Sequence, residues 1–539
     1  MQFSDVVASP GAKLSTTPTL RLSVLCLVCA MLAILAAWPV LTTPFMPLLD
    51  YPNHMARMHV LLQAGQNSSA GLGSPLDQFY RVQWRLVPDL GLDLVVPLLA
   101  RIMPLDWAGR CFILLIMALM VAGTFAVSRM LHGRVGWWPC LSFLFLYDHI
   151  LLMGFLNYLI GAGLMLLGIA AWLAVRRRAP VLRIAVGTAF AVGLYFAHLF
   201  AFGIYGLVVA GYELQQVYRV WRSRQGGGIG PEVGRLAIAA AQFVVPAILL
   251  VVFVLILRSY APGADAAAGI GVGFGKFARK FDLIFSVFDD YDRVFDISSF
   301  VVLVLGFVVA VWRGLIRISP AMALPLSLLA IAYFVMPTSL VTAFALDRRM
   351  PVAFALLLIA ASQPVRWRPG AEVMVASALV VLFTARMALI QVNWQESSAL
   401  YQPWADALDQ LPRGAKLALA SPPNAERMVP GEAPFVHFPL IAVARRDAFV
   451  PTLFALPTQQ PVELRPAYRS LAVATRPDRL WDAFVEHPAG ASTELREQVG
   501  RYDYVLFLGN APFHVADDAQ LTPVRGDSKF QLFKVRSQP

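Results

Sequence analysis

Charged side chains are scarce in this chain of 539 residues, and their scarcity limits its broad class. Only 14% of the residues are Asp, Glu, Lys or Arg, whereas soluble domains usually carry about 25%. Apolar residues make up 58% of the chain, and the mean hydropathy is +0.64. Many charge-free windows reach the roughly 20 residues that a helix needs to cross a bilayer. The composition therefore excludes an ordinary soluble protein and predicts a polytopic helical membrane protein.

Cysteine is nearly absent as well. All four cysteines lie within apolar runs, and two of them, Cys26 and Cys29, have the C-x-x-C spacing of redox and zinc motifs. On a helix surrounded by lipid this spacing is weak evidence for either chemistry. We interpret all four as small apolar side chains; the other two are Cys111 and Cys140.

The net charge of +11 comes from basic residues that cluster between the apolar runs. Three such clusters are RMLHGR (129–134), RRRAPVLR (176–183) and YRVWRSRQ (218–225). Cytoplasmic loops of membrane proteins carry an excess of Lys and Arg. The distribution therefore predicts cytoplasmic loops at these positions, and no nucleic-acid partner is expected.

The apolar runs and the loop charges together predict an all-α polytopic membrane domain at residues 20–390, with about eleven transmembrane helices. Residues 1–19 are predicted to form a disordered cytoplasmic tail, and residues 42–109 a long first outer loop. Within this loop, segment 90–103 is apolar, but counting it as a span would place the basic clusters outside. We therefore predict that it lies as a helix on the outer membrane surface. The predicted spans are about 20–41, 110–128, 137–151, 155–175, two short helices within 181–217, 235–257, 296–312, 319–336, 351–364 and 371–390.

The composition changes at about residue 391, where polar residues return and no run of span length remains. Strand-like pieces occur at 416–420, 504–509 and 530–535. Because the predicted number of spans is odd, residues 391–539 are expected to form an extracytoplasmic α/β domain of ordinary size. The composition, rich in Ala, Arg and Pro, indicates a bacterium. The predicted location is thus the bacterial inner membrane, with this domain in the periplasm.

The stretch PLLDYPNHMARMHVL (47–61) concentrates polar side chains after the first apolar run. His54 and Arg57 follow Asp50 by four and seven residues, a spacing that places all three on one face of a helix. An acid, an imidazole and a guanidinium in one stripe suit a proton acceptor held near an anionic ligand. The alternative is structural, because an Asp before Pro52 can cap the first amides of a helix. That alternative explains Asp50 but neither His54 nor Arg57.

Three further polar groups face the predicted outer side. An ionisable residue at membrane depth is a functional candidate by default, although a solvated turn or ordinary interface anchoring also explains residues near the boundary. Paired arginines on the outer side are unusual, and Arg suits bidentate binding of phosphate. The groups are Asp148 with His149; Lys276, Arg279 and Lys280; and Arg348 with Arg349.

The order of these parts resembles the GT-C fold of integral-membrane glycosyltransferases, such as the aminoarabinose and protein O-mannosyl transferases. These enzymes take a sugar from a polyprenyl-phosphate carrier. In the family a long first outer loop carries a catalytic Asp or Glu, and LLDYPNH supplies Asp50 there. LGLDLVVPLLARIM (90–103) matches the family's surface helix, Asp148 the acid of the next outer loop, and LDRRMP, with Arg348 and Arg349, the basic residue before a late span.

The resemblance implies a fold, a reaction and partners. Asp50 would be the catalytic base, with His54 beside it, while Asp148 would orient the acceptor or bind a divalent cation. The expected partners are a polyprenyl-phosphate-linked sugar, membrane lipid, and an envelope glycan, lipid or protein as acceptor. The residues assigned to substrate binding are Arg57, His149, Lys276, Arg279, Lys280, Arg348 and Arg349.

A non-catalytic alternative is a transporter or flippase for a lipid-linked envelope intermediate, or a scaffold for an envelope complex. Transporters often contain internal repeats, and they carry polar groups near the middle of the membrane on broken helices. We find no internal repeat in this chain, and its polar groups crowd toward one face of the predicted bundle. Both observations favour the enzyme.

Overall fold

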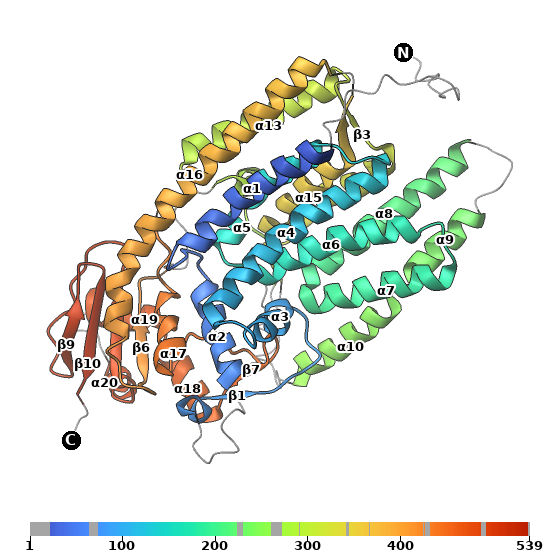
Figure 1. Ribbon diagram of the computed structural model, residues 1–539. Coiled ribbons are helices and arrows are strands. Elements are labelled where there is room, and N and C mark those ends of the chain that lie inside the picture. The colour runs from blue at the N-terminus through green and yellow to red at the C-terminus, as the bar shows by residue number, and fades with distance from the viewer. Residues whose placement is uncertain are drawn as a thin grey trace.

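The computed structural model describes residues 22–63, 74–223, 230–259, 272–289, 291–340, 344–365, 367–423, 425, 432–486 and 492–536. Long helices fill most of the molecule, and a small sheet with short helices forms one end (Figure 1). Among these residues seven helices are long and apolar enough to cross a membrane, so the prediction of a multi-pass helical membrane protein is confirmed. They are α1 (Leu22–Thr42), α4 (Leu105–His132), α6 (Leu156–Val175), α7 (Pro180–Ala197), the pair α9 (Gly230–Ala241) and α10 (Val244–Ser259) counted together, α13 (Arg293–Trp312) and α16 (Pro369–Leu408).

Seven is fewer than the eleven spans predicted, because several apolar segments form short or broken helices. The predicted span 137–151 is divided into the 3₁₀ segment η2 (Trp138–Phe145) and the single turn α5 (His149–Leu152). Two more helices, α14 (Ala323–Val335) and α15 (Leu346–Ala361), have 13 and 16 residues, fewer than the roughly 20 that span a bilayer. The 25-residue α8 (Leu199–Ser223) carries charged residues along its second half.

Helices α4 and α6 form the centre of the bundle. Phe112, Ile116 and Leu166 are almost fully buried between them and their neighbours. A Cβ atom on Gly163 of α6 would lie 2.6 Å from the Cβ of Leu119 in α4. The missing side chain therefore lets the two helices approach closely, as small residues commonly do in membrane bundles.

The segment predicted as the first outer loop, residues 42–109, contains two helices, α2 (Tyr51–Gln63) and α3 (Gly91–Leu99). Helix α3 lies within the segment predicted as a surface helix. It buries Leu92 and Val96 but exposes Leu94 and Leu98. This division into a buried and an exposed apolar face is what a helix between protein and membrane surface requires.

A four-stranded mixed sheet lies in the C-terminal region, which we define as residues 409–536. Its strand order is β6-β8-β10-β9; β6 and β8 are parallel, and the other pairs are antiparallel. The strands are β6 (Leu417–Ala420), β8 (Tyr504–Leu508), β9 (Leu521–Gly526) and β10 (Phe530–Val535), so the three strand-like pieces predicted from the sequence are confirmed. Short helices complete the region: α17 (Ile441–Arg446), α18 (Pro466–Ala474), α19 (Pro477–Trp481) and α20 (Thr493–Val499).

Two connections join the C-terminal region to the helical bundle. Helix α16 continues past residue 391 to Leu408, and its last turns bury Tyr401, Trp404 and Leu408 in the core of the C-terminal region. Strand β1 (Tyr80–Val82) of the first outer loop pairs antiparallel with β7 (Val462–Leu464). The first outer loop and the C-terminal region therefore pack as one structure. Other short elements are β2 (Val272–Gly273) paired with β4 (Ser339–Leu340), β3 (Ile316–Ile318) paired with β5 (Ser362–Pro364), and α12 (Arg279–Ile284).

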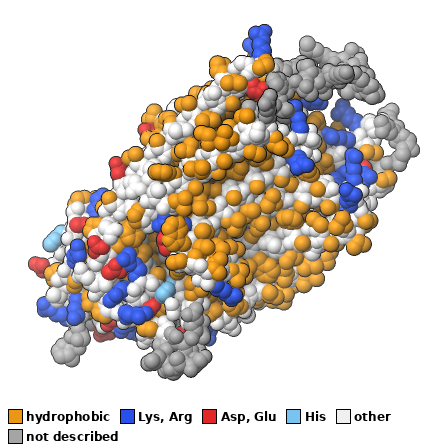
Figure 2. All heavy atoms as spheres, in the orientation of Figure 1, with side chains coloured by type: hydrophobic (Ala, Val, Ile, Leu, Met, Phe, Trp, Pro, Cys, Tyr) orange, Lys and Arg blue, Asp and Glu red, His pale blue; other side chains and the backbone are white. Residues whose placement is uncertain are grey.

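Apolar and charged side chains are separated on the surface, as they are along the sequence. Apolar side chains cover the middle of the molecule, and Lys, Arg, Asp and Glu gather toward its two ends (Figure 2). Soluble monomers rarely expose apolar patches larger than a few hundred Å², so this belt fits contact with lipid. Examples from α10 and α13 are Ile248, Val251, Leu255, Val302, Leu305 and Val308.

Candidate functional site

The site is built around the α5–α6 turn, residues 153–155. Gly154 has φ +80°, and a Cβ there would lie 2.8 Å from the Asp50 nitrogen and 2.9 Å from its Cβ. Only glycine accepts this combination of left-handed backbone and close approach without strain. The Asp50 N–H donates to the Met153 carbonyl at 3.2 Å. Asp50 from the first outer loop is thus fixed against the segment that carries Asp148.

The side chain of Asp50 meets a histidine of the C-terminal region. Asp50 is 8% exposed, and its Oδ1 lies 3.5 Å from Nε2 of His437. The Asn53 amide is oriented by two backbone partners, since its Nδ2 donates to the Thr452 carbonyl and its Oδ1 accepts from the Phe454 N–H. That same Nδ2 lies 3.3 Å from Nδ1 of His437 and can only donate.

The tautomer of His437 follows from this contact. Because Nδ1 accepts from Asn53, the ring proton lies on Nε2, which faces Asp50. Burial lowers the pKa of His437 to about 4, so the ring is neutral near pH 7. A neutral N–H directed at a carboxylate holds that carboxylate in place.

His54 and Arg57 form a second buried chain. The Arg57 guanidinium binds both oxygens of Asp93, at 2.8 and 2.9 Å, and both side chains are about 1% exposed or less. Its Nη1 lies 3.4 Å from Nδ1 of His54, and Nε2 of His54 lies 3.1 Å from the Gly154 carbonyl. A carbonyl only accepts and a guanidinium only donates, so His54 is neutral with its proton on Nε2. Burial, followed by the charge of Arg57, lowers the pKa of His54 well below its ordinary value.

Asp148 and His149 lie at the start of α5. Asp148 is fully buried; its Oδ1 caps α5 by accepting from the Leu151 N–H at 2.8 Å, and its Oδ2 has no hydrogen-bond partner among the described residues. Nε2 of His149 lies 2.7 Å from Nη1 of Arg348. The group of Asp148 and His149 and the group of Arg348 and Arg349 are therefore in contact, although about 200 residues separate them in the sequence.

Arg349 also contacts this turn, through the ring of Phe155. Its guanidinium is 4.7 Å from the ring centre of Phe155 and 6.0 Å from that of Tyr158, and it contacts Nε2 of His198 at 3.1 Å. Among the described residues no carboxylate lies within ion-pair distance of this buried cation, and its Nε has no hydrogen-bond partner. Two carboxylates act on it at longer range, that of Asp89 more strongly and that of Asp50 less strongly.

The three residues Lys276, Arg279 and Lys280 differ in burial. Lys280 is buried and pairs with Asp347 at 3.4 Å, which links it to the helix that carries Arg348 and Arg349. Lys276 and Arg279 are exposed, and neither side chain has a hydrogen bond or ion pair with the described part of the chain. The structure therefore brings Lys280, but neither of the two exposed cations, into the buried polar cluster.

Two participants escaped the sequence analysis. His437 stands in an apolar stretch of the C-terminal region, and nothing in its neighbours indicates that Asp50 is near. Arg386 of α16 binds Asp296 at 2.7 Å and the carbonyls of Phe288 and Tyr147 at 3.2 Å. A signal for Arg386 was present, because a charge inside an apolar run is a functional candidate by default.

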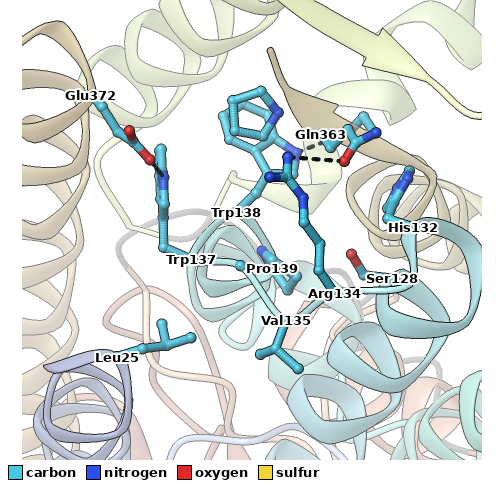
Figure 3. A pocket seen from close by; sticks show the side chains of 13 residues that line it. Leu25, Ser128, His132, Arg134, Val135, Trp137, Trp138, Pro139, Gln363 and Glu372 are labelled. Carbon is cyan, nitrogen blue, oxygen red and sulfur yellow. Dashed lines mark hydrogen bonds between the residues drawn. The ribbon is translucent and has the colours of Figure 1, made fainter. Parts of the chain in front are cut away.

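A separate small pocket lies where α4 ends and α16 begins (Figure 3). Its volume is about 40 Å³, which is enough for water rather than for a substrate. Several of its polar groups bind one another, so it does not offer a set of free binding groups. The pairs are Trp137 with Glu372, Trp138 with Ser362, and Arg134 with Gln363.

The described residues contain no group of three or more His, Cys, Asp and Glu side chains that could hold a metal ion. Asp148 therefore belongs to no such group among the described residues. Comparison with known proteins adds no family: no protein-family model matches the chain, and no curated protein matches it significantly. The structure establishes a multi-helix membrane protein with a C-terminal mixed sheet.

Proposed function

We propose that the protein is a membrane glycosyltransferase that moves a sugar from a polyprenyl-phosphate carrier to an envelope acceptor. One observation carries the proposal: the carboxylate-bearing Asp50 and the buried Arg349, which has no ion pair with a carboxylate among the described residues, both contact the turn at residues 153–155. Glycosyl transfer needs a proton acceptor and a stabiliser of the departing phosphate, and this pair supplies both.

Asp50 is the group best suited to take the proton. Its two histidine neighbours already carry a proton on Nε2, and Nδ1 of each accepts from Arg57 or Asn53. In the reaction the acceptor oxygen bonds to the anomeric carbon with inversion, the carbon–oxygen bond to the carrier phosphate breaks, and the hydroxyl proton moves to Asp50. His54 and His437 then act as positioning residues.

Arg349 is suited to the carrier phosphate. A guanidinium presents several N–H donors in a fixed fork that matches phosphate oxygens, and the aromatic rings of Phe155 and Tyr158 hold it in place. Arg348 lies next to it in the chain and contacts His149. Arg57 has the opposite character, because both oxygens of Asp93 already occupy it. We therefore assign phosphate binding to the arginines of α15 and support of His54 to Arg57.

The test is an envelope-glycan profile by mass spectrometry. A deletion strain is complemented with wild-type protein, Asp50→Asn or the matched control Asp517→Asn, which changes an exposed acid of the C-terminal region. All proteins are verified at equal membrane levels. Asn occupies the same volume and caps a helix as well as Asp, so Asp50→Asn removes only the carboxylate.

We expect the deletion to lose a sugar that wild type and Asp517→Asn restore and Asp50→Asn does not. Full restoration by Asp50→Asn would show that Asp50 is not the base. A deletion strain that loses the sugar, accumulates a lipid-linked intermediate and is restored by Asp50→Asn would favour the transporter instead.

A further inference from the structure

A groove separate from Asp50 lies between the first outer loop and the C-terminal region. Its volume is about 320 Å³, near the lower end of the roughly 300–1,000 Å³ range of ligand pockets. Arg81 and Arg465 supply its cations, Asp77 its acid and the partly exposed Val82 its apolar surface, whereas Val60 and Tyr80 are almost fully buried beneath it. Strand β1 lines the groove, and Arg465 follows directly after β7, the strand paired with β1, so both parts of the chain contribute to it.

The charge beside this groove is unbalanced. Glu463 is fully buried and lies close to three guanidinium groups, those of Arg81 at 2.7 Å, Arg85 at 3.1 Å and Arg469 at 3.5 Å. One carboxylate neutralises one of these three cations. The side chains of Arg81 and Arg469 remain 47% and 45% exposed, so part of each is open to a ligand.

Arg465 adds a fourth cation. Its Nε donates to the backbone carbonyl of Asp77 at 2.6 Å, which fixes the guanidinium at the groove. Among the described residues it makes no ion pair. The carboxylate of Asp77 accepts from the Ser74 N–H instead. Three arginines with exposed side chains, Arg81, Arg465 and Arg469, thus lie at or beside the groove.

We propose that this groove binds an acidic oligosaccharide, through carboxylate groups on its sugar rings. Guanidinium forks match carboxylates in a bidentate geometry, and the partly exposed Val82 offers a small apolar surface for the C–H face of a sugar. Val60 follows Asp50 by ten residues, a distance of about 15 Å along a helix. An oligosaccharide bound in the groove would therefore lie within about 15 Å of Asp50 along α2. Its role as the acceptor rests on the proposed function, whereas its binding does not.

The test is isothermal titration calorimetry on the purified full-length protein in detergent, with trigalacturonic acid as probe. Maltotriose, a neutral trisaccharide, and inorganic phosphate are titrated in parallel. We expect trigalacturonic acid to bind, to bind more weakly as salt rises, and to bind at least tenfold more tightly than either comparison probe. The double variant Arg81→Gln/Arg465→Gln should weaken binding at least tenfold, while Arg536→Gln, an exposed arginine beside β10, should leave it unchanged.

Thermal unfolding verifies that the variants are folded; if the double variant is not, the single variant Arg465→Gln carries the test, with an expected loss of at least threefold. Equal binding by wild type and the charge-removed variant would overturn the proposal. So would phosphate binding as tight as that of trigalacturonic acid, which would indicate a site for small anions only. Probe binding together with full glycan restoration by Asp50→Asn would refute the proposed function but support the proposal that the groove binds acidic oligosaccharides.

Discussion

The buried ion pair between Arg57 and Asp93 tests how the first outer loop is held. Both side chains are removed from water, and the two contacts of 2.8 and 2.9 Å form a bidentate pair. The change Asp93→Leu leaves the guanidinium charge buried without a counter-ion. Removal of one partner of such a pair costs about 3–5 kcal/mol, whereas replacement of both by apolar residues is often neutral. We therefore expect Asp93→Leu and Arg57→Met each to lose about 3–5 kcal/mol, and Arg57→Met/Asp93→Leu to regain most of it.

The assay is urea unfolding of the four purified proteins in one detergent, followed by tryptophan fluorescence. The coupling energy is the difference between the double variant and the sum of the single variants. Single losses below about 1 kcal/mol that simply add would refute the structural role of the pair. An Arg57→Met variant of unchanged stability that fails to restore the envelope glycan would instead assign Arg57 to substrate binding, as the resemblance implies.

Two further predictions concern the groups around Asp50. Gly154→Ala places a Cβ in the left-handed region against Asp50. We therefore expect this variant to lose at least about 1–2 kcal/mol of stability and to fail to restore the glycan. The control Gly193→Ala, with no atom within 4 Å of the added Cβ, should keep its stability and restore the glycan. An active Gly154→Ala protein would contradict the packing argument. The second prediction concerns the pH dependence of stability. The pKa of His437 is about 4 in the folded protein and about 6.5 in the unfolded chain. Between about pH 4 and pH 6.5 the unfolded chain therefore binds one proton more than the folded protein, so stability rises with pH. Urea unfolding should lose about 3 kcal/mol from pH 7 to pH 4, less in His437→Gln, and an identical slope in the variant would contradict this assignment.

The C-terminal strands and helix α3 were predictable from local patterns, because each depends on residues that are neighbours in the chain. The broken span at residues 138–152 was not predictable in the same way. Hydropathy reports that a segment is apolar, and both a continuous helix and a 3₁₀ segment followed by one helical turn satisfy that condition. The backbone path was decided by packing against α4 and α15.

Sequence alone determined that this is a multi-pass membrane protein and that Asp50 stands in an unusual polar stretch, since composition and spacing are local quantities. Only the tertiary structure decided which polar groups are already satisfied. Arg57 forms an ion pair with a carboxylate 36 residues away, and Asn53 a hydrogen bond with a histidine 384 residues away. Whether a buried cation is a structural partner or an open binding group depends on what lies across from it, and distant chain segments are placed by packing, not by residue spacing.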